Sequence, residues 1–477
     1  MKLKYVIFSI IIVLTSCSES FLDLYPETSL HEENFYKSDN DFIQLVNGSY
    51  IPLRDNEKST HWNVSEVKSD NMDLQWSNTN IEQNRNSSFD YNSASTTHKS
   101  HWDTNYKGIY NCNKAINVLE NIEYQWKNVN LKERSHGEVY FLRALYYFNL
   151  VRQFGGVPLL SEAVSGDDAI NIKRSTLDET YNFIIRDLEK AIGHLKNIGT
   201  TNEYGRVNLG AAQGLLGKVY LTIKNYSTAE EYLKEVIDSG KFGLLENYAD
   251  VFDPTHKDYY ETIFSIQYSE NSEELSNSFI FFNAPATSGG AITNRPNVNL
   301  NVNIALKPTE TLINAFELGD ERYSVSIGEW TGKNNAGNIE TFYYCAKYKG
   351  PQTAGLGWCG DNFPILRYSD ILLMYAEALN ELGRTADASV FVKKVRNRAN
   401  LTNDISNLNQ SELRLLIEHE RQVEFCFENQ RWYDLLRTDR AIEVNAALGK
   451  TLLPHQLIAP IPGDQIMINK LEQNPGY

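Results

Sequence analysis

The feature that most constrains the fold is a pair of helical patterns that occurs twice. The first copy spaces small and large apolar residues as a helix does, at Leu216, Gly217, Tyr220, Ala229, Leu233 and Val236. The second copy is degenerate and has Leu372, Ala376, Leu379, Ala388, Val392 and Val395. Small residues let paired helices approach, and larger ones fill the groove between them. Because such pairs bury their apolar faces only by stacking, the repeat predicts a short right-handed superhelix of helix pairs.

The spacing within each copy is that of tetratricopeptide repeats. Helical periodicity predicts helices over residues 38–54, 98–126, 131–154, 176–196, 207–223, 227–239, 363–382, 385–399, 410–427 and 429–443. Residues 243–360 are instead rich in Asn, Ser, Thr, Gly and aromatic residues, with short β-like runs. The sequence therefore predicts a mainly α fold. A helical scaffold over 17–242 and 361–477 is interrupted by a loop-rich insert over 243–360, with minor β-structure.

The charge balance restricts the partners of this chain. It has 61 Asp and Glu against 45 Lys and Arg, a formal net charge of −16. Residues 1–16 hold two lysines and no acid, so the remainder has 43 basic residues against 61 acids and a net charge of −18. Nucleic-acid phosphates require a positive surface, and charge cannot hold an acidic chain on anionic lipid. We therefore expect no nucleic-acid partner.

The N-terminus reads as an export signal. Lys2 and Lys4 precede an apolar run of about ten residues, whereas a membrane span needs about twenty. The run ends at Leu14-Thr15-Ser16-Cys17, which resembles the bacterial lipobox. We expect residues 1–16 to be removed and Cys17 to be acylated, which would anchor the chain to a membrane. The alternatives are an ordinary signal peptide with an accidental cysteine, or a short helix hairpin.

Four further cysteines lie in the expected mature chain. Export places them in an oxidising compartment, where Cys345 and Cys359 could form a disulfide across a 13-residue loop. The alternative is two free, half-buried thiols, and the sequence does not decide between them. Cys112 and Cys426 lie in helical patterns and are expected to be small core residues.

Charged residues are prominent near the C-terminus. Glu420, Arg421 and Glu424 follow one another at spacings that permit ion pairs along a helix. The segment 428–435 then combines an acid, an arginine and a tryptophan. We interpret that cluster as a buried ion pair beneath an aromatic ring rather than as a binding site.

Motifs of catalysis are missing from the sequence. It contains no GxSxG, HExxH, Walker or EF-hand pattern, and its nine histidines show no i, i+4 pair. A glycosidase needs only two carboxylates, but no feature selects a pair among 61 acids. We therefore expect a protein that is not an enzyme, without a cofactor or a metal site.

The class of function that remains is binding, and sugars are the candidate ligand. Sugar rings stack on exposed aromatic faces, and their hydroxyls hydrogen-bond to polar side chains. Two loop-rich stretches offer this combination. The candidate ligand contacts are Asp73, Trp76, Asn78, Arg85, Trp330 and Trp358. The alternative for each tryptophan is that it fills the boundary between insert and scaffold. Other tryptophans lie in helical patterns and are expected in the core, namely Trp102, Trp126 and Trp432.

Ordered motifs along essentially the whole chain resemble the SusD/RagB family of Bacteroidetes nutrient-uptake lipoproteins. They include Cys17, Phe21-Leu22-Asp23-Leu24-Tyr25-Pro26, Arg143-Ala144-x-x-Tyr147-Phe148, Phe316-x-x-Gly319-Asp320-x-Arg322, Arg367-Tyr368-Ser369-Asp370, Arg431-Trp432-Tyr433-Asp434 and Asn474-Pro475-Gly476-Tyr477.

The resemblance implies a lipid-anchored protein on the outer-membrane surface. Such proteins pair with a TonB-dependent SusC-like transporter, usually capture oligosaccharides and are not enzymes. In the family the ligand site lies in variable loops, which correspond by order to the loop around Trp76 and to the insert. Two alternatives stay open: capture of a non-glycan nutrient such as peptide, and glycoside hydrolysis.

Overall fold

Helices make up most of the structure, a computed structural model that describes residues 35–58, 60–74, 80–164, 166–198, 205–255, 260–288, 290–293, 306–333, 337–350 and 358–477. The long helices are α3 (Asp39–Glu57), α6 (Thr96–Asn121), α7 (Val129–Phe154), α9 (Leu177–Leu195), α10 (Leu209–Thr222), α11 (Tyr226–Asp238), α16 (Tyr368–Glu381), α17 (Thr385–Arg398) and α18 (Gln410–Glu424). The predictions for residues 1–16, Cys17, Trp76 and Asn78 lie outside the described ranges.

Shorter elements connect these helices. The short α-helices are α4 (Thr60–Val64), α5 (Ile81–Ser87), α8 (Gly166–Ala169), α12 (Phe279–Asn283), α13 (Gly290–Thr293), α14 (Glu310–Ala315), α15 (Arg322–Ser326), α19 (Arg431–Arg437), α20 (Ala441–Ala447) and α21 (Gly463–Asn469). The 3₁₀ turns are η2 (Glu66–Lys68), η3 (Tyr248–Phe252), η4 (Ala286–Ser288) and η6 (Pro454–Leu457). The strands are β1 (Met72–Leu74), β2 (Thr262–Ile266), β3 (Leu306–Pro308), β4 (Ile327–Lys333), β5 (Ile339–Cys345) and β6 (Phe363–Arg367). They pair antiparallel as β1–β3, β2–β6 and β4–β5.

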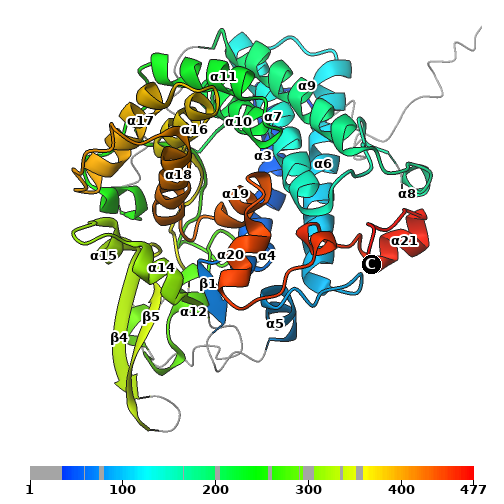
Figure 1. Cartoon of the computed structure of the whole chain (residues 1–477). Coiled ribbons are helices and arrows are strands. Elements are labelled where there is room, and N and C mark those ends of the chain that lie inside the picture. Colours follow the sequence, from blue (N-terminus) through cyan, green and yellow to red (C-terminus); the bar gives the residue numbers. More distant parts are fainter. Residues whose placement is uncertain are drawn as a thin grey trace, which may run out of the picture.

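The helix pairs predicted from the repeat are present. Helix α10 packs against α11 and α16 against α17, and α11 lies against α16, so that the two pairs stack (Figure 1). A Cβ atom on Gly217 would lie 2.7 Å from Cγ of Leu233, so this contact between α10 and α11 requires a residue without a side chain. The prediction of a mainly α fold with tetratricopeptide-like pairs is therefore confirmed.

Local sequence signals explain several helix ends. Helix α9 begins at a capping box in which Thr176 and Glu179 bond to each other's backbone N–H groups. Helix α7 ends at Gly155, whose φ of 74° suits glycine, and Pro158 follows three residues later. Almost all of α7 is buried, including both faces of its second half, so it forms the centre of the core.

Two predicted helices differ from the structure. Residues 363–367 form β6 instead of the first turns of the helix predicted over 363–382, because they pair antiparallel with β2. The helix predicted over 429–443 is divided into α19 and α20, and Asp439 between them has a φ of 61° that no helix accommodates.

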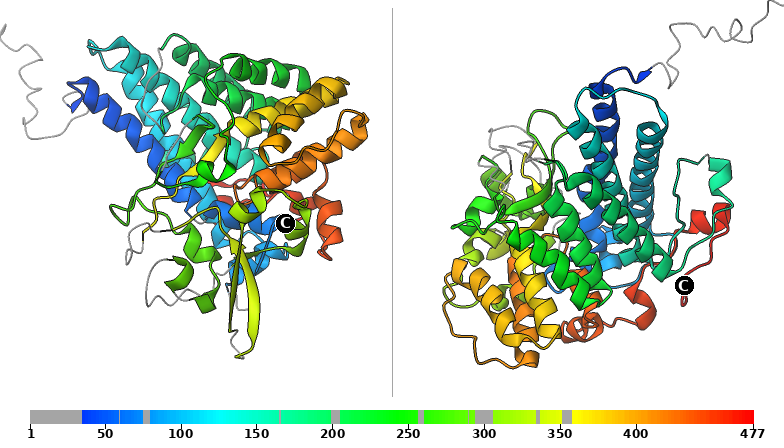
Figure 2. Two further views of the ribbon diagram at one scale, coloured as in Figure 1. Left: turned by 90° about the vertical axis from the view of Figure 1, so that its left-hand side faces the viewer. Right: turned by 90° about the horizontal axis from the view of Figure 1, so that it is seen from above.

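The β4–β5 hairpin projects from the helices, as Figure 1 and the left-hand view of Figure 2 show. In the part of the chain that the structure describes, no helix combines the length and apolar character required to cross a bilayer.

Candidate functional site

The β4–β5 hairpin carries a row of aromatic side chains on one face. Trp330 lies opposite Phe342 in the ladder, and Tyr344 lies opposite Gly328 two residues further along. Successive side chains of a strand alternate between faces, so these three rings share one face. Each of them is half-buried. We call Trp330, Phe342 and Tyr344 the aromatic strip.

Two glycines of β4 make room for the rings. A Cβ atom on Gly328 would lie 2.2 Å from the ring of Tyr344, and one on Gly332 would lie 2.5 Å from the indole nitrogen of Trp330. Both rings therefore lie close over backbone that has no side chain, as aromatic residues often do over glycine in sheets. The result is a low, apolar surface of the kind on which a sugar ring can stack.

The opposite face of the hairpin carries polar contacts, one of them to the adjoining helix α15. The hydroxyl of Tyr323 donates to Oε1 of Glu329 at 3.0 Å. Burial, together with this bond to a carboxylate, raises the pKa of Tyr323 to about 12, so the hydroxyl keeps its proton at neutral pH. Thr331 and Thr341 bond to each other across the strands at 3.1 Å. These contacts fix the orientation of the hairpin, and its aromatic face stays half-buried.

Buried ion pairs hold both ends of the hairpin at the C-terminal end of α18. Arg322, just before β4, binds Glu420 at 3.0 Å and Glu424 at 3.2 Å. Lys347, just after β5, binds Glu428 at 2.7 Å. All of these side chains are at least 98% buried, so water does not screen the attraction as it does at a surface.

The structure brings Asp73 to the same side of the molecule as the aromatic strip. Asp73 pairs with Lys307 in the β1–β3 sheet, and β3 packs beside β5 (Figure 1). Thr309, after β3, donates its N–H to the carbonyl of Asn71 at 3.0 Å. Asp70 accepts two bonds from Arg431, so β1 is fixed to the scaffold. Strand β1 therefore lies near the hairpin, although more than 230 residues separate β1 from β3 in the sequence.

The other predicted contacts lie further from the strip. Arg85 is on α5, which packs beside β1, and its guanidinium is 3.4 Å from Glu82. Trp358 is half-buried beside Cys359, whose backbone pairs with Asn277. Sequence reasoning missed Phe342 and Tyr344. The signal was present as aromatic residues two apart on β5, opposite a strand with glycines four apart.

The disulfide considered for Cys345 and Cys359 is not formed. All four described cysteines are free and buried, and burial raises the pKa of both thiols. Cys345 ends β5 opposite Ile327, whereas the carbonyl of Cys359 accepts from the N–H of Asn277 at 3.0 Å. Each cysteine is thus fixed by a separate backbone pairing. Cys112 and Cys426 are core residues, as predicted.

One group of residues has the composition of a metal site. Ligand atoms of Glu317, His419 and Glu420 lie within 4.8 Å of one another. Nη1 of Arg396 donates to both carboxylates at 2.7 Å, and so it takes the place between them that a cation would need. We assign no metal to this cluster.

Comparison with known proteins identifies the family of this chain. A family model described as "Starch-binding associating with outer membrane" matches residues 20–221, and one described as "SusD family" matches residues 317–452. SusD-like protein P38 of Formosa agariphila is 29% identical, with 98% of this chain and 96% of that protein covered.

Two solved structures of SusD-like proteins have a similar fold. A laminarin-binding SusD-like protein is 25% identical with a TM-score of 0.78, and the match covers 93% of this chain and all of that one. A SusD superfamily protein of Parabacteroides distasonis is 26% identical with a TM-score of 0.80, covering 92% and 99%. Two family models, relatives matched along nearly their whole length and a shared fold together show that the chain belongs to the SusD/RagB family.

Proposed function

We propose that this protein is a cell-surface, lipid-anchored glycan-binding protein that captures oligosaccharides or polysaccharide. The observation that carries the proposal is the aromatic strip, a row of three rings on a projecting hairpin whose base is fixed by buried ion pairs. Rigid aromatic surfaces suit sugar rings because little order is lost on binding. The similarity to a laminarin-binding protein supports the same ligand class.

We further propose that the captured glycan passes to a TonB-dependent SusC-like transporter in the outer membrane, to which Cys17 anchors the protein. This rests on family membership. Affinity purification from mildly solubilised outer membranes should recover a large β-barrel protein, and repeated recovery without one would count against the partnership.

The site assignment predicts the effect of Trp330→Ala. One stacked ring contributes about 1 kcal/mol, so the variant should bind the preferred glycan roughly fivefold more weakly. Binding should be measured against a panel that includes laminarin, starch and their oligosaccharides, with product release followed in parallel. The matched control is Thr331→Ala, on the opposite face of the same strand, which should bind as the wild type does.

The same panel separates the competing functions. Undiminished binding by Trp330→Ala would remove the strip from the site. Binding of peptides and of no saccharide would favour another nutrient. Release of product by the pure protein would overturn the assignment as a binding protein and favour a glycoside hydrolase.

A further inference from the structure

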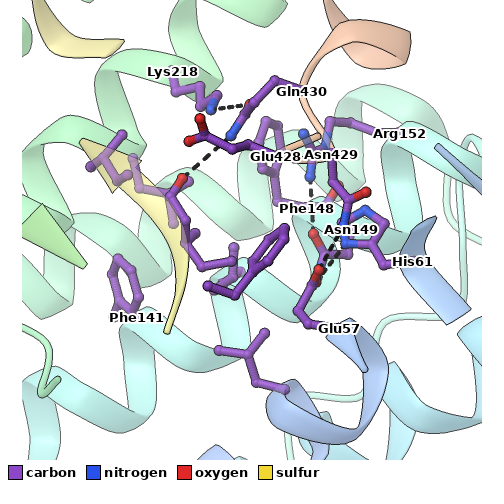
Figure 3. A pocket seen from close by; sticks show the side chains of 16 residues that line it. Glu57, His61, Phe141, Phe148, Asn149, Arg152, Lys218, Glu428, Asn429 and Gln430 are labelled. Carbon is purple, nitrogen blue, oxygen red and sulfur yellow. Dashed lines mark hydrogen bonds and ion pairs between the residues drawn. The ribbon is translucent and has the colours of Figure 1, made fainter. Parts of the chain in front are cut away.

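A cavity inside the scaffold lies between α7, α10, β6 and residues 428–430 (Figure 3). Its volume is about 30 Å³, which is room for on the order of two water molecules or one small ion. The lining combines apolar side chains with acidic, basic and amide groups. It is remote from the aromatic strip in sequence and belongs to different elements.

The carboxylates of the lining are already satisfied. Glu57 binds Nδ1 of His61 at 2.5 Å and accepts from Nδ2 of Asn429 at 2.8 Å. Both carboxylate oxygens of Glu428 accept from Arg367 at 2.9 Å. Lys347 adds a further bond to Glu428 from outside the cavity, at 2.7 Å. Neither acid therefore depends on a cation within the cavity.

Arg152 is different, because no carboxylate among the described residues lies within 4 Å of its guanidinium. Its Nε donates to the carbonyl of Phe148 at 3.1 Å, and its Nη2 donates to Oδ1 of Asn149 at 2.9 Å. Its central carbon lies 4.0 Å from the ring centres of both Phe148 and Tyr433. The rings hold the guanidinium in place and leave the Nη1 hydrogens without a protein acceptor in the described part of the chain.

A second cation lines the cavity. Nζ of Lys218 donates to Asp370 at 2.9 Å and to Oε1 of Gln430 at 2.6 Å, which uses two of its three hydrogens. Figure 3 shows Lys218 and Gln430 joined on one side of the cavity, apart from the group formed by Glu57, His61 and Asn429. Two cations thus line the cavity. No carboxylate among the described residues is in direct contact with Arg152, and Glu57 and Asp434 act on it only at longer range.

We propose that this cavity binds one small inorganic anion, chloride-like in size, through Nη1 of Arg152 with help from Lys218. The guanidinium of Arg152 is half-buried and has no carboxylate in contact with it, and an anion in hydrogen-bonding range of Nη1 would offset the cost of its partial desolvation. The free volume of about 30 Å³ is sufficient for one ion of the size of chloride.

The test compares thermal unfolding of the mature full-length protein in sodium chloride and in sodium gluconate at equal ionic strength. A ligand that binds only the folded state raises the midpoint with concentration. We expect chloride to raise it by about 1–3 °C relative to gluconate, and Arg152→Met to abolish this difference. Arg186→Met is the matched control, since Arg186 also lies near a phenylalanine ring but is exposed on α9, and it should keep the chloride effect.

Bromide soaked into crystals of the wild type gives a second measurement that does not depend on a variant. Anomalous scattering should place bromide within hydrogen-bonding range of Arg152. Equal midpoints in chloride and gluconate, bromide found only elsewhere, or stabilisation by phosphate as strong as that by chloride would each overturn the proposal.

Discussion

Glu424→Gln is expected to lower the free energy of unfolding by about 3–5 kcal/mol, because removing one partner of a buried ion pair leaves the other charge uncompensated. The carboxylate of Glu424 binds arginines from three elements, at 2.9 Å from Arg367, 2.5 Å from Arg398 and 3.2 Å from Arg322. All four side chains are almost completely buried. Urea unfolding of the variant and the wild type at pH 7 measures the difference.

The pH dependence of that difference has a definite sign. Burial alone would raise the pKa of Glu424, but the guanidinium groups of Arg398, Arg367 and Arg322 hold it well below its usual range. A carboxyl whose pKa is lower in the folded than in the unfolded state contributes stability above the unfolded pKa and loses it as the pH falls. The difference in free energy of unfolding between the wild type and Glu424→Gln should therefore become smaller below about pH 4.

An exposed pair gives the control. Glu443 binds Arg440 at the surface and is 71% exposed, so Glu443→Gln should change stability by less than about 0.5 kcal/mol. A Glu424→Gln variant as stable as this control would show that the buried network is not what fixes the hairpin.

Lys68→Met is expected to stabilise the protein by about 1–3 kcal/mol at pH 6. Lys68 is fully buried, and its Nζ has no hydrogen-bond partner in the described part of the chain. It lies 4.7 Å from the ring centre of Tyr91 and 4.5 Å from that of Trp432. These cation–π contacts offset only part of the cost of burying an unpaired charge. Methionine has a similar shape and no charge.

The pH profile distinguishes this cause from a change in packing. Burial lowers the pKa of Lys68 to about 7, while the unfolded chain keeps a value near 10.5. Between these values the unfolded state binds more protons, so stability rises with pH, and the cost is greatest below pH 7. Lys68 also acts on His98, whose pKa is lowered by burial and further by the charge of Lys68.

The gain from Lys68→Met should accordingly be larger at pH 6 than at pH 10, as measured by urea unfolding at both values. Lys107→Met, at an exposed position of α6, should show no such dependence. A gain that is equal at the two pH values would point to packing rather than charge as its origin.

The helical part of this fold could be predicted from sequence because its signals are local. Apolar periodicity and small residues at fixed offsets define α10, α11, α16 and α17, and capping residues mark the start of α18. The sheets could not be predicted in this way. Strand β1 pairs with β3 across more than 230 residues, and each has only three residues, too few to show alternation.

The partners of the buried ion pairs could not be predicted from local sequence either. Spacing suggested pairs along α18 among Glu420, Arg421 and Glu424, but the structure directs these side chains to other elements. Local spacing shows which residues can meet on one helix, whereas burial between helices decides which ones do. The cluster near Trp432 is buried as predicted, although Arg431 pairs with Asp70 and not with its neighbours in sequence.

At the candidate site, composition predicted the aromatic type of the residues, whereas their arrangement depends on how the strands pair. Trp330 was named because tryptophan in a loop-rich insert suits sugar binding. Its neighbours on the strip, Phe342 and Tyr344, depend on the register of a hairpin. That register follows from strand pairing, in which a slip of one residue moves every side chain to the other face.

Hydrogen exchange of backbone amides with and without a bound glycan tests the central claim most directly, with laminarin as the first probe and the tightest ligand of the panel as the second. We predict slower exchange in β4 and β5, over Ile327–Lys333 and Ile339–Cys345, because a ligand on the aromatic strip covers this hairpin. Glycan binding that leaves the hairpin unchanged and slows exchange only in the helix pairs α10–α11 and α16–α17 would contradict the account.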